Sequence, residues 1–155
     1  MLALVLALTV LTGCGPYTYY GGTGLHDVTP ADVAGVWENV EGTRLAFDED
    51  GTAILENLDG QDFDFDDGWR LSGTGTWQLT DDDGGQKVRL ALTARTQAGT
   101  RLSLSPGEEP PPEPPSTYTW YFYVDRAQQD ELTLFFFFGD PDAGNTYVMT
   151  RGTAP

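Results

Sequence analysis

The alternation of apolar and polar residues over positions 68–80 is the feature that most constrains the fold. In GWRLSGTGTWQLT, the odd positions from Trp69 to Leu79 carry Trp, Leu or Gly, and the even positions from Arg70 to Thr80 carry polar side chains. Successive side chains of a β-strand point to opposite faces of a sheet. This period of two therefore predicts a strand with one buried face and one solvated face.

The same period recurs along most of the chain and predicts an all-β fold. Only Thr29-Pro30-Ala31-Asp32 predicts a short helical turn, because it offers an N-cap, a proline at the first helical position and an acid at the third. We expect an antiparallel up-and-down meander that closes into a small barrel of about 8 to 10 strands, since closure removes exposed strand edges. The predicted strands span residues 35–40, 43–48, 52–57, 61–65, 68–80, 86–94, 100–105, 117–124, 131–138 and 145–151.

The chain of 155 residues has room for one domain of ordinary size, and we assign residues 29–155 to a single β-barrel domain. Residues 106–115, with the sequence PGEEPPPEPP, cannot lie inside a sheet because proline donates no ladder hydrogen bond. They predict a stiff polyproline loop between two strands.

The first residues predict an export signal. Residues 1–12, MLALVLALTVLT, form an apolar run that is shorter than the roughly 20 residues needed to cross a bilayer. The next residues complete Leu11-Thr12-Gly13-Cys14, which resembles the lipobox of bacterial lipoproteins. The alternative is an ordinary secretory signal or a buried helix, with a chance Leu-Thr-Gly-Cys.

The lipobox resemblance implies that residues 1–13 are cleaved and that the Cys14 sulfur carries a diacylglyceryl group. The protein would then be exported and anchored by lipid to the outer face of the cell membrane. We expect residues 14–28 to form a flexible tether, because this stretch is rich in Gly, Tyr and Thr without helix or strand periodicity.

Gly35-Val36-Trp37 opens the first predicted strand directly after the helical turn, and it resembles the Gly-x-Trp signature of lipocalins and related calycin barrels. The resemblance implies a lipocalin-like barrel in which Trp37 plugs the closed end and Arg151 packs over it in a cation-π contact. A core Trp in an unrelated barrel is the alternative. The tail segment FFFFGDPDAGNTYVMTR also resembles small lipoproteins of high-G+C bacteria.

Charge and residue inventory argue against several function classes. With 24 Asp and Glu against 8 Lys and Arg, the net charge of -16 would repel nucleic acid. The only histidine, His26, lies in the predicted tether, and the only cysteine, Cys14, is assigned to lipid. No Ser-His-Asp or Cys-His arrangement is thus available, and we expect a protein without enzymatic activity and without cofactor. A carboxylate-based hydrolase stays as a remote alternative.

Residues 62–67, Asp-Phe-Asp-Phe-Asp-Asp, raise the question of a metal site. In a strand, alternate carboxylates are about 6.5 to 7 Å apart, which is too far for all of them to reach one calcium ion. We therefore expect no metal here, and a strand with Phe63 and Phe65 facing inward.

The aromatic residues of 117–124 and 131–138 supply the candidate binding site. Both faces of both predicted strands carry large rings, whereas a barrel wall has only one inside. An outward patch of rings indicates a partner, so we expect a non-catalytic binding module for a small apolar ligand, a glycan or a protein partner. The alternatives are cover by the tether (Tyr17, Tyr19 and Tyr20), the Pro-rich loop or a second copy, and an envelope protein with a structural or interaction role and no small-molecule site. The predicted outward residues are Tyr121, Tyr123, Phe135 and Phe137.

Overall fold

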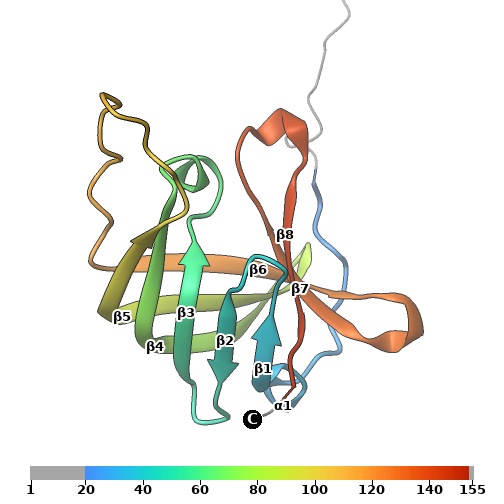
Figure 1. Cartoon of the computed structure of the whole chain (residues 1–155). Helices are drawn as coiled ribbons and strands as arrows, with labels where there is room; N and C mark the ends of the chain where they lie inside the picture. The colour runs from blue at the N-terminus through green and yellow to red at the C-terminus, as the bar shows by residue number, and fades with distance from the viewer. Residues whose placement is uncertain (1–19, 154–155) are drawn as a thin grey trace, which may run out of the picture.

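The computed structural model describes residues 20–153 and contains an eight-stranded, closed antiparallel β-barrel with little helix (Figure 1). Each strand pairs with its neighbours in sequence, and β1 pairs with β8 to close the barrel. The all-β meander predicted from the alternation is confirmed. The elements are α1 (Pro30–Val33), β1 (Gly35–Glu38), β2 (Arg44–Phe47), β3 (Thr52–Asp59), η2 (Phe63–Phe65), β4 (Trp69–Asp82), β5 (Gly85–Thr100), β6 (Tyr118–Arg126), η3 (Gln128–Asp130), β7 (Leu132–Phe137), η4 (Pro141–Ala143) and β8 (Thr146–Arg151).

The long hairpin of β4 and β5 shows how the alternation becomes structure. The odd positions of β4 from Trp69 to Trp77 are buried, as predicted. A side chain at Gly73 would place its Cβ only 2.2 Å from the Ala94 carbonyl oxygen, and one at Gly75 would meet the Ala91 carbonyl oxygen at 2.1 Å. The two strands approach closely at these glycines, where the register shifts and the barrel wall bends.

Two predicted strands are wrong. Residues 61–65 form a loop with the short 3-10 helix η2, and Phe63 is 62% exposed instead of facing inward. The chain leaves the sheet here because Asp62 adopts a left-handed φ of 51°, which a regular strand does not permit. Residues 101–105 likewise lie outside β5, which ends at Thr100.

Side chains fill the barrel interior. An eight-stranded barrel has an interior just wide enough to be filled in this way. The largest fully buried side chains come from all eight strands and, for Val33, from α1, and they belong to one continuous core. They are Trp37, Trp120, Phe122, Phe136, Leu45, Leu55, Leu58, Leu71, Leu90, Leu134, Met149 and Val33.

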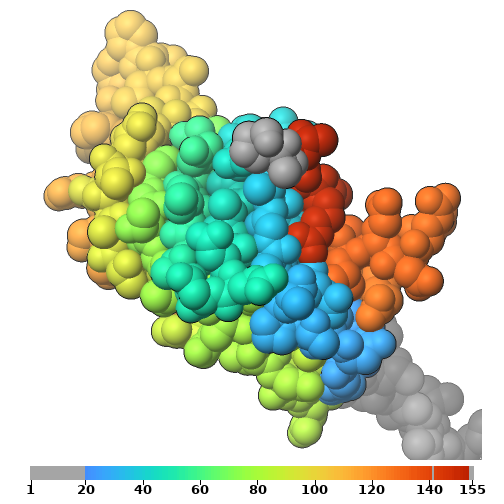
Figure 2. All heavy atoms as spheres, turned by 90° about the horizontal axis from the view of Figure 1, so that it is seen from below, coloured from blue at the N-terminus to red at the C-terminus, as the bar shows by residue number. Residues whose placement is uncertain are grey.

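The helical turn α1 covers one end of the barrel, which Figure 2 shows as a filled surface. Thr29 caps α1 in a reciprocal capping box with Asp32, as the sequence predicts. The Trp37 indole donates to the Val33 carbonyl oxygen at 2.8 Å. This end is called the closed end below.

The segment 20–28 packs on the barrel, which differs from the flexible tether predicted for it, whereas residues 14–19 of that predicted tether lie outside the described residues. Its backbone bonds the β4–β5 hairpin: Gly24 donates to the Gly84 carbonyl oxygen at 2.9 Å, and Gln86 donates to the Leu25 carbonyl oxygen at 2.7 Å. The Gln86 amide also bonds both backbone groups of the buried Val28, at 2.8 Å each. Composition alone did not reveal these specific backbone bonds.

Candidate functional site

Four loops lie at the end of the barrel opposite α1, which is called the loop end below (Figure 1). They connect β1 to β2, β3 to β4, β5 to β6 and β7 to β8. The Pro-rich segment 106–115 belongs to the β5–β6 loop and lies outside the strands, as predicted. Binding residues concentrate on loops that a rigid scaffold holds, so this end of the barrel is a candidate location for a site.

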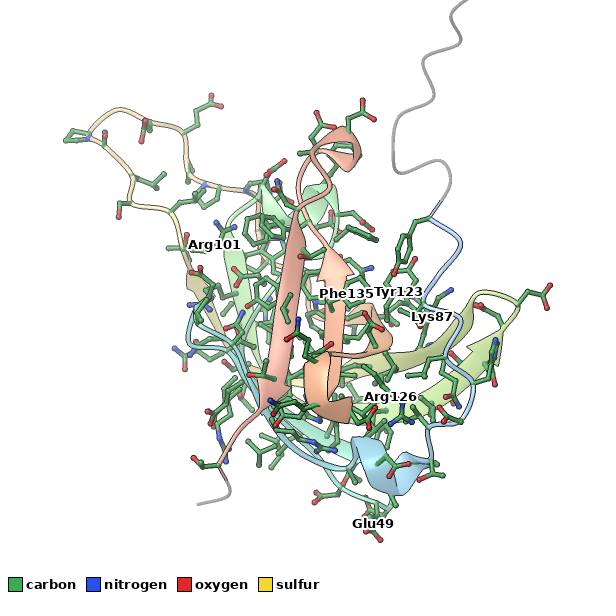
Figure 3. The ribbon with its side chains drawn as sticks, turned by 90° about the vertical axis from the view of Figure 1, so that its right-hand side faces the viewer. Glu49, Lys87, Arg101, Tyr123, Arg126 and Phe135 are labelled. Carbon is green, nitrogen blue, oxygen red and sulfur yellow. The ribbon has the colours of Figure 1, made fainter. Side chains whose placement is uncertain are left out.

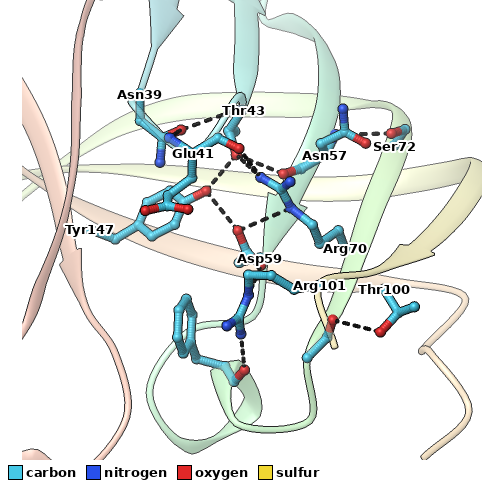
Figure 4. Close-up of polar contacts among 12 residues, drawn as sticks. Asn39, Glu41, Thr43, Asn57, Asp59, Arg70, Ser72, Thr100, Arg101 and Tyr147 are labelled. Atoms are coloured by element: carbon cyan, nitrogen blue, oxygen red, sulfur yellow. Dashed lines mark hydrogen bonds and ion pairs between the residues drawn. The ribbon is translucent and has the colours of Figure 1, made fainter. Parts of the chain in front are cut away.

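A buried ionic cluster lies directly beneath the loops (Figure 4). Asp59, at the end of β3, is 0% exposed. The Nε of Arg101 donates to one of its oxygens at 2.8 Å, and the hydroxyl of Tyr147 donates to the other at 2.9 Å. Arg70, its register partner on β4, places Nε 3.3 Å from the second oxygen. The two guanidinium groups beside it compensate the burial of this carboxylate.

The cluster extends to the β1–β2 turn through Thr43. The Thr43 hydroxyl contacts the Tyr147 hydroxyl and donates to the Asn57 carbonyl oxygen at 2.6 Å. Burial raises the pKa of Tyr147 to about 12, with the Asp59 charge adding to the effect. The contacts of the cluster thus connect β3, β4 and β8 to the β1–β2 turn.

The β3–β4 loop closes the barrel above this cluster. The guanidinium carbon of Arg101 lies 3.7 Å from the centre of the Phe65 ring, which in turn packs on Phe138 at 4.2 Å. Backbone bonds fix the loop to the β7–β8 connection, since Asp62 donates to the Phe137 carbonyl oxygen at 3.0 Å. The closed end has a matching contact, with the Arg151 guanidinium carbon 4.1 Å from the centre of the Trp37 ring.

The structure thus brings Trp37 and Arg151 together, the pair that the calycin resemblance proposed for closing the barrel. They are register partners on β1 and β8. The Arg151 guanidinium also donates to three carbonyl oxygens at the end of α1, those of Asp32, Val33 and Ala34.

The seam between β1 and β8 is open toward the loop end. Only Thr150 and Arg151 of β8 pair with β1, whereas positions 146 to 149 pair with β7 alone. β1 ends early because the Asn39 side-chain oxygen accepts the amides of Glu41 and Thr43, both at 3.0 Å, and turns the chain toward β2.

This open seam leaves backbone groups without a strand partner. Phe138 donates to the Asn145 carbonyl oxygen, so the odd positions of β8 bond toward β7, and the amides and carbonyls of Thr146 and Val148 point to the β1 side. Within residues 20–153, neither residue makes a hydrogen bond there. A groove of about 610 Å³ runs along the seam. It is lined by Glu38, Asn39, Val40, Glu41, Phe65, Phe138, Thr146, Tyr147, Val148 and Thr150.

The predicted aromatic patch is divided in two. Tyr20 of the docked N-terminal segment packs edge-on against Tyr123 at 4.9 Å, Phe137 at 5.0 Å and Phe135 at 6.2 Å. Figure 3 shows Tyr123 and Phe135 side by side on the face where this segment runs. Three of the four predicted residues are therefore half-buried within the chain, which is one of the covers the sequence analysis considered; Tyr17 and Tyr19 lie outside the described residues.

Tyr121 does not join the other three rings. It is 46% exposed and faces a separate hollow of about 360 Å³ beside Asp62, Phe63 and Asp64. Burial, and secondarily the charge of Asp64, raise the pKa of Asp62. These two carboxylates form the kind of pair that the hydrolase alternative requires.

The remaining predicted residues occupy other places. Cys14 lies outside the described residues, and His26 pairs with Asp81 through Nδ1 at 2.6 Å. Among residues 20–153, no group of three or more His, Cys, Asp or Glu side chains could hold a metal ion. In the same range, no helix has the length and apolar character to cross a bilayer.

Sequence reasoning missed the Asp59 cluster and the open seam. The signal for the cluster was a lone acid after Leu58, at the end of an apolar alternation, but the chain contains 24 acidic residues and this one did not stand out. Comparison with known proteins adds no relative, since no family model, no curated protein and no solved structure matches the chain.

Proposed function

We propose that this protein is a lipid-anchored, non-catalytic binding protein of the cell envelope, and that it binds an extended peptide segment of a partner protein along the β8 edge. The single observation that carries the binding role is the open seam. Thr146 and Val148 offer backbone donors and acceptors two residues apart, which is the spacing that an added antiparallel or parallel strand requires.

The groove beside this edge defines the chemistry of the partner. Phe65, Phe138 and Tyr147 line the groove and would receive apolar side chains from one face of the added strand. Val40, at the tip of the β1–β2 turn, is fully exposed and would pack on the other face.

The charge around the groove favours a partner peptide with basic residues. Glu38 is paired with Arg44 at 3.4 Å, whereas Glu41 has no ion pair within the described part of the chain. With a net charge of -16 on the whole chain, the groove favours a peptide whose apolar residues alternate with Lys or Arg.

The anchor rests on the lipobox residues Leu11-Thr12-Gly13-Cys14. Tyr20, packed on the barrel, is six residues from Cys14, so an extended chain would hold the barrel within about 20 Å of a lipid on that cysteine. The proposed binding edge would then work close to the membrane surface. Mass spectrometry of the protein purified from its own membrane tests this directly, and the absence of a diacylglyceryl mass on Cys14 would refute the anchor.

The peptide site is tested with Val148→Pro. The Val148 amide points to the open seam, so proline removes one donor of the exposed edge and leaves the β7–β8 ladder intact. We would display two libraries of eight-residue peptides, with apolar residues alternating either with Lys and Arg or with Asp and Glu.

We expect binders from the basic library alone. Bound peptide should protect the Thr146 and Val148 amides from hydrogen exchange, and Val148→Pro should weaken binding about tenfold or more. The control Val148→Thr keeps the amide and should bind like the parent chain. Equal binding to the proline variant, with its fold verified by circular dichroism, would refute the proposal.

A second candidate function, the carboxylate-based hydrolase, is favoured by one observation: Asp62 and Asp64 share a hollow and the pKa of Asp62 is raised. Release of nitrophenol from a panel of nitrophenyl glycosides tests it. Activity that disappears in both Asp62→Asn and Asp64→Asn would support this function, and no turnover across the panel would oppose it.

A further inference from the structure

The hollow beside Tyr121 combines two features that lie far apart in the sequence. One side comes from the η2 turn of the β3–β4 loop, and the other from the first residues of β6. It lies outside the proposed peptide groove, and the two share no lining residue. Its lining residues are Gln61, Asp62, Phe63, Asp64, Tyr118, Thr119 and Tyr121.

Two aromatic rings of the hollow are free to receive a ligand. Phe63 is 62% exposed and Tyr121 is 46% exposed. In the described part of the chain, neither ring stacks on another aromatic residue, whereas the Tyr118 ring packs on Trp69 at 5.1 Å and on Trp120 at 4.7 Å. The rings of Phe63 and Tyr121 are thus exposed and take no part in the aromatic packing of the described residues.

Two carboxylates accompany these rings. Asp64 accepts the Tyr118 hydroxyl at 2.7 Å, which fixes its orientation. The Asp62 carboxylate makes no hydrogen bond or ion pair among residues 20–153. The two carboxylates repel each other, and a cation between them would relieve that repulsion.

The backbone that carries these groups is held in place. The Gln61 side-chain oxygen accepts the Tyr121 amide at 2.9 Å, so the loop is attached to β6 at the hollow itself. On the other side, Gly139 donates to the Asp62 carbonyl oxygen at 2.9 Å. The backbone around the hollow therefore needs little ordering when a ligand binds.

We propose that this hollow binds an organic cation, namely a methylated ammonium group held between the Phe63 and Tyr121 rings with Asp62 and Asp64 beside it. Aromatic faces attract such cations through the ring quadrupole, and carboxylates add a direct charge interaction. Arg89, the register partner of Tyr121 on β5, is not among the residues that line the hollow. The ligand class follows from this combination, because rings alone would also accept a neutral sugar.

The test compares choline with 3,3-dimethyl-1-butanol, which has the same shape without the charge. Each is titrated into the full chain at constant ionic strength, and backbone amide shifts of Asp62, Asp64 and Tyr121 are followed by NMR. We expect choline to bind with a Kd on the order of millimolar, and the alcohol to bind at least about tenfold more weakly.

Variants locate the site. Tyr121→Ala should weaken choline binding about fivefold or more, and Tyr121→Phe should retain it because the ring remains. Asp62→Asn should also weaken it, whereas Ile54→Ala, at an exposed apolar position on β3, should not change it. Equal affinity for choline and the alcohol, or unchanged choline binding in a folded Tyr121→Ala variant, would overturn the proposal.

Discussion

Replacing Asp59 by Asn should destabilise the barrel strongly, although the two side chains have the same shape. Asp59 is fully buried, and it accepts one hydrogen bond from Arg101 at 2.8 Å and one from Tyr147 at 2.9 Å. A neutral amide leaves Arg70 and Arg101 without their counter-charge. Its NH₂ group must also face at least one of three donors, namely the Nε of Arg70, the Nε of Arg101 or the Tyr147 hydroxyl. No cavity is created, so the cost is electrostatic.

The magnitude follows from the surroundings of the two arginines. Removing one partner of a buried ion pair costs about 3 to 5 kcal/mol. The side chains of Arg70 and Arg101 keep 17% and 26% of their exposure and regain some hydration, which lowers the cost. We expect a loss of about 3 kcal/mol in the free energy of unfolding, out of a total of about 5 to 15 kcal/mol for a domain of this size.

Guanidinium chloride unfolding, followed by tryptophan fluorescence, measures this change. All four tryptophans are buried in the barrel core and report on its loss. The control Asp83→Asn removes an exposed acid from the β4–β5 turn and should stay within about 0.5 kcal/mol of the parent. The electrostatic reasoning is refuted if Asp59→Asn costs less than about 1 kcal/mol, or if the two variants lose equal stability.

Three further predictions concern other parts of the barrel. The raised pKa of Tyr147 means that the unfolded chain releases this proton first, so stability should fall by roughly 2 to 3 kcal/mol between about pH 10 and pH 12 from this group. In Tyr147→Phe, unfolding curves at several pH values should show a correspondingly shallower decline. Tyr20→Ala should cost about 1 to 2 kcal/mol and raise binding of the dye ANS, because Tyr123 and its neighbouring rings become exposed; unchanged dye fluorescence would contradict the docking of Tyr20. Arg151→Lys should lower the thermal midpoint by several degrees, since lysine cannot reach three carbonyl oxygens and lie over Trp37 at once, and calorimetry measures this.

The sequence predicted the parts of this molecule in which side-chain period and burial agree. The alternation from Trp69 to Trp77 appears in β4 without change. It failed at residues 61–65, where Asp and Phe also alternate, because the pattern cannot show that the backbone turns at Asp62. Because residues 61–65 were predicted as a strand, the sequence did not place Phe63 near Tyr121, although both residues line the same hollow in the structure.

The second difference from the prediction is the docking of residues 20–28 on the barrel, and contacts between distant segments explain it. Residues 20–28 have the composition of a linker, and their docking depends on bonds to Gly84 and Gln86. These bonds are made to backbone groups and to one amide side chain, so an apolar sequence pattern does not predict them. The outward rings of β6 and β7, which the sequence predicted, form one side of this contact, and Tyr20 forms the other side.

The position of the candidate sites follows from how completely the barrel is filled. A barrel of eight strands can hold a small ligand in its interior when that interior is not filled. Here the fully buried rings of Trp120, Phe122 and Phe136 belong to the core that fills the interior. Arginines lie over aromatic rings at both ends. A ligand in the interior would have to displace this core at a cost of several kcal/mol. The unpaired edge of β8 and the hollow beside Tyr121 are available without that cost, because one lacks only a strand and the other already exposes its rings. Recognition by this barrel is therefore expected on its outer wall.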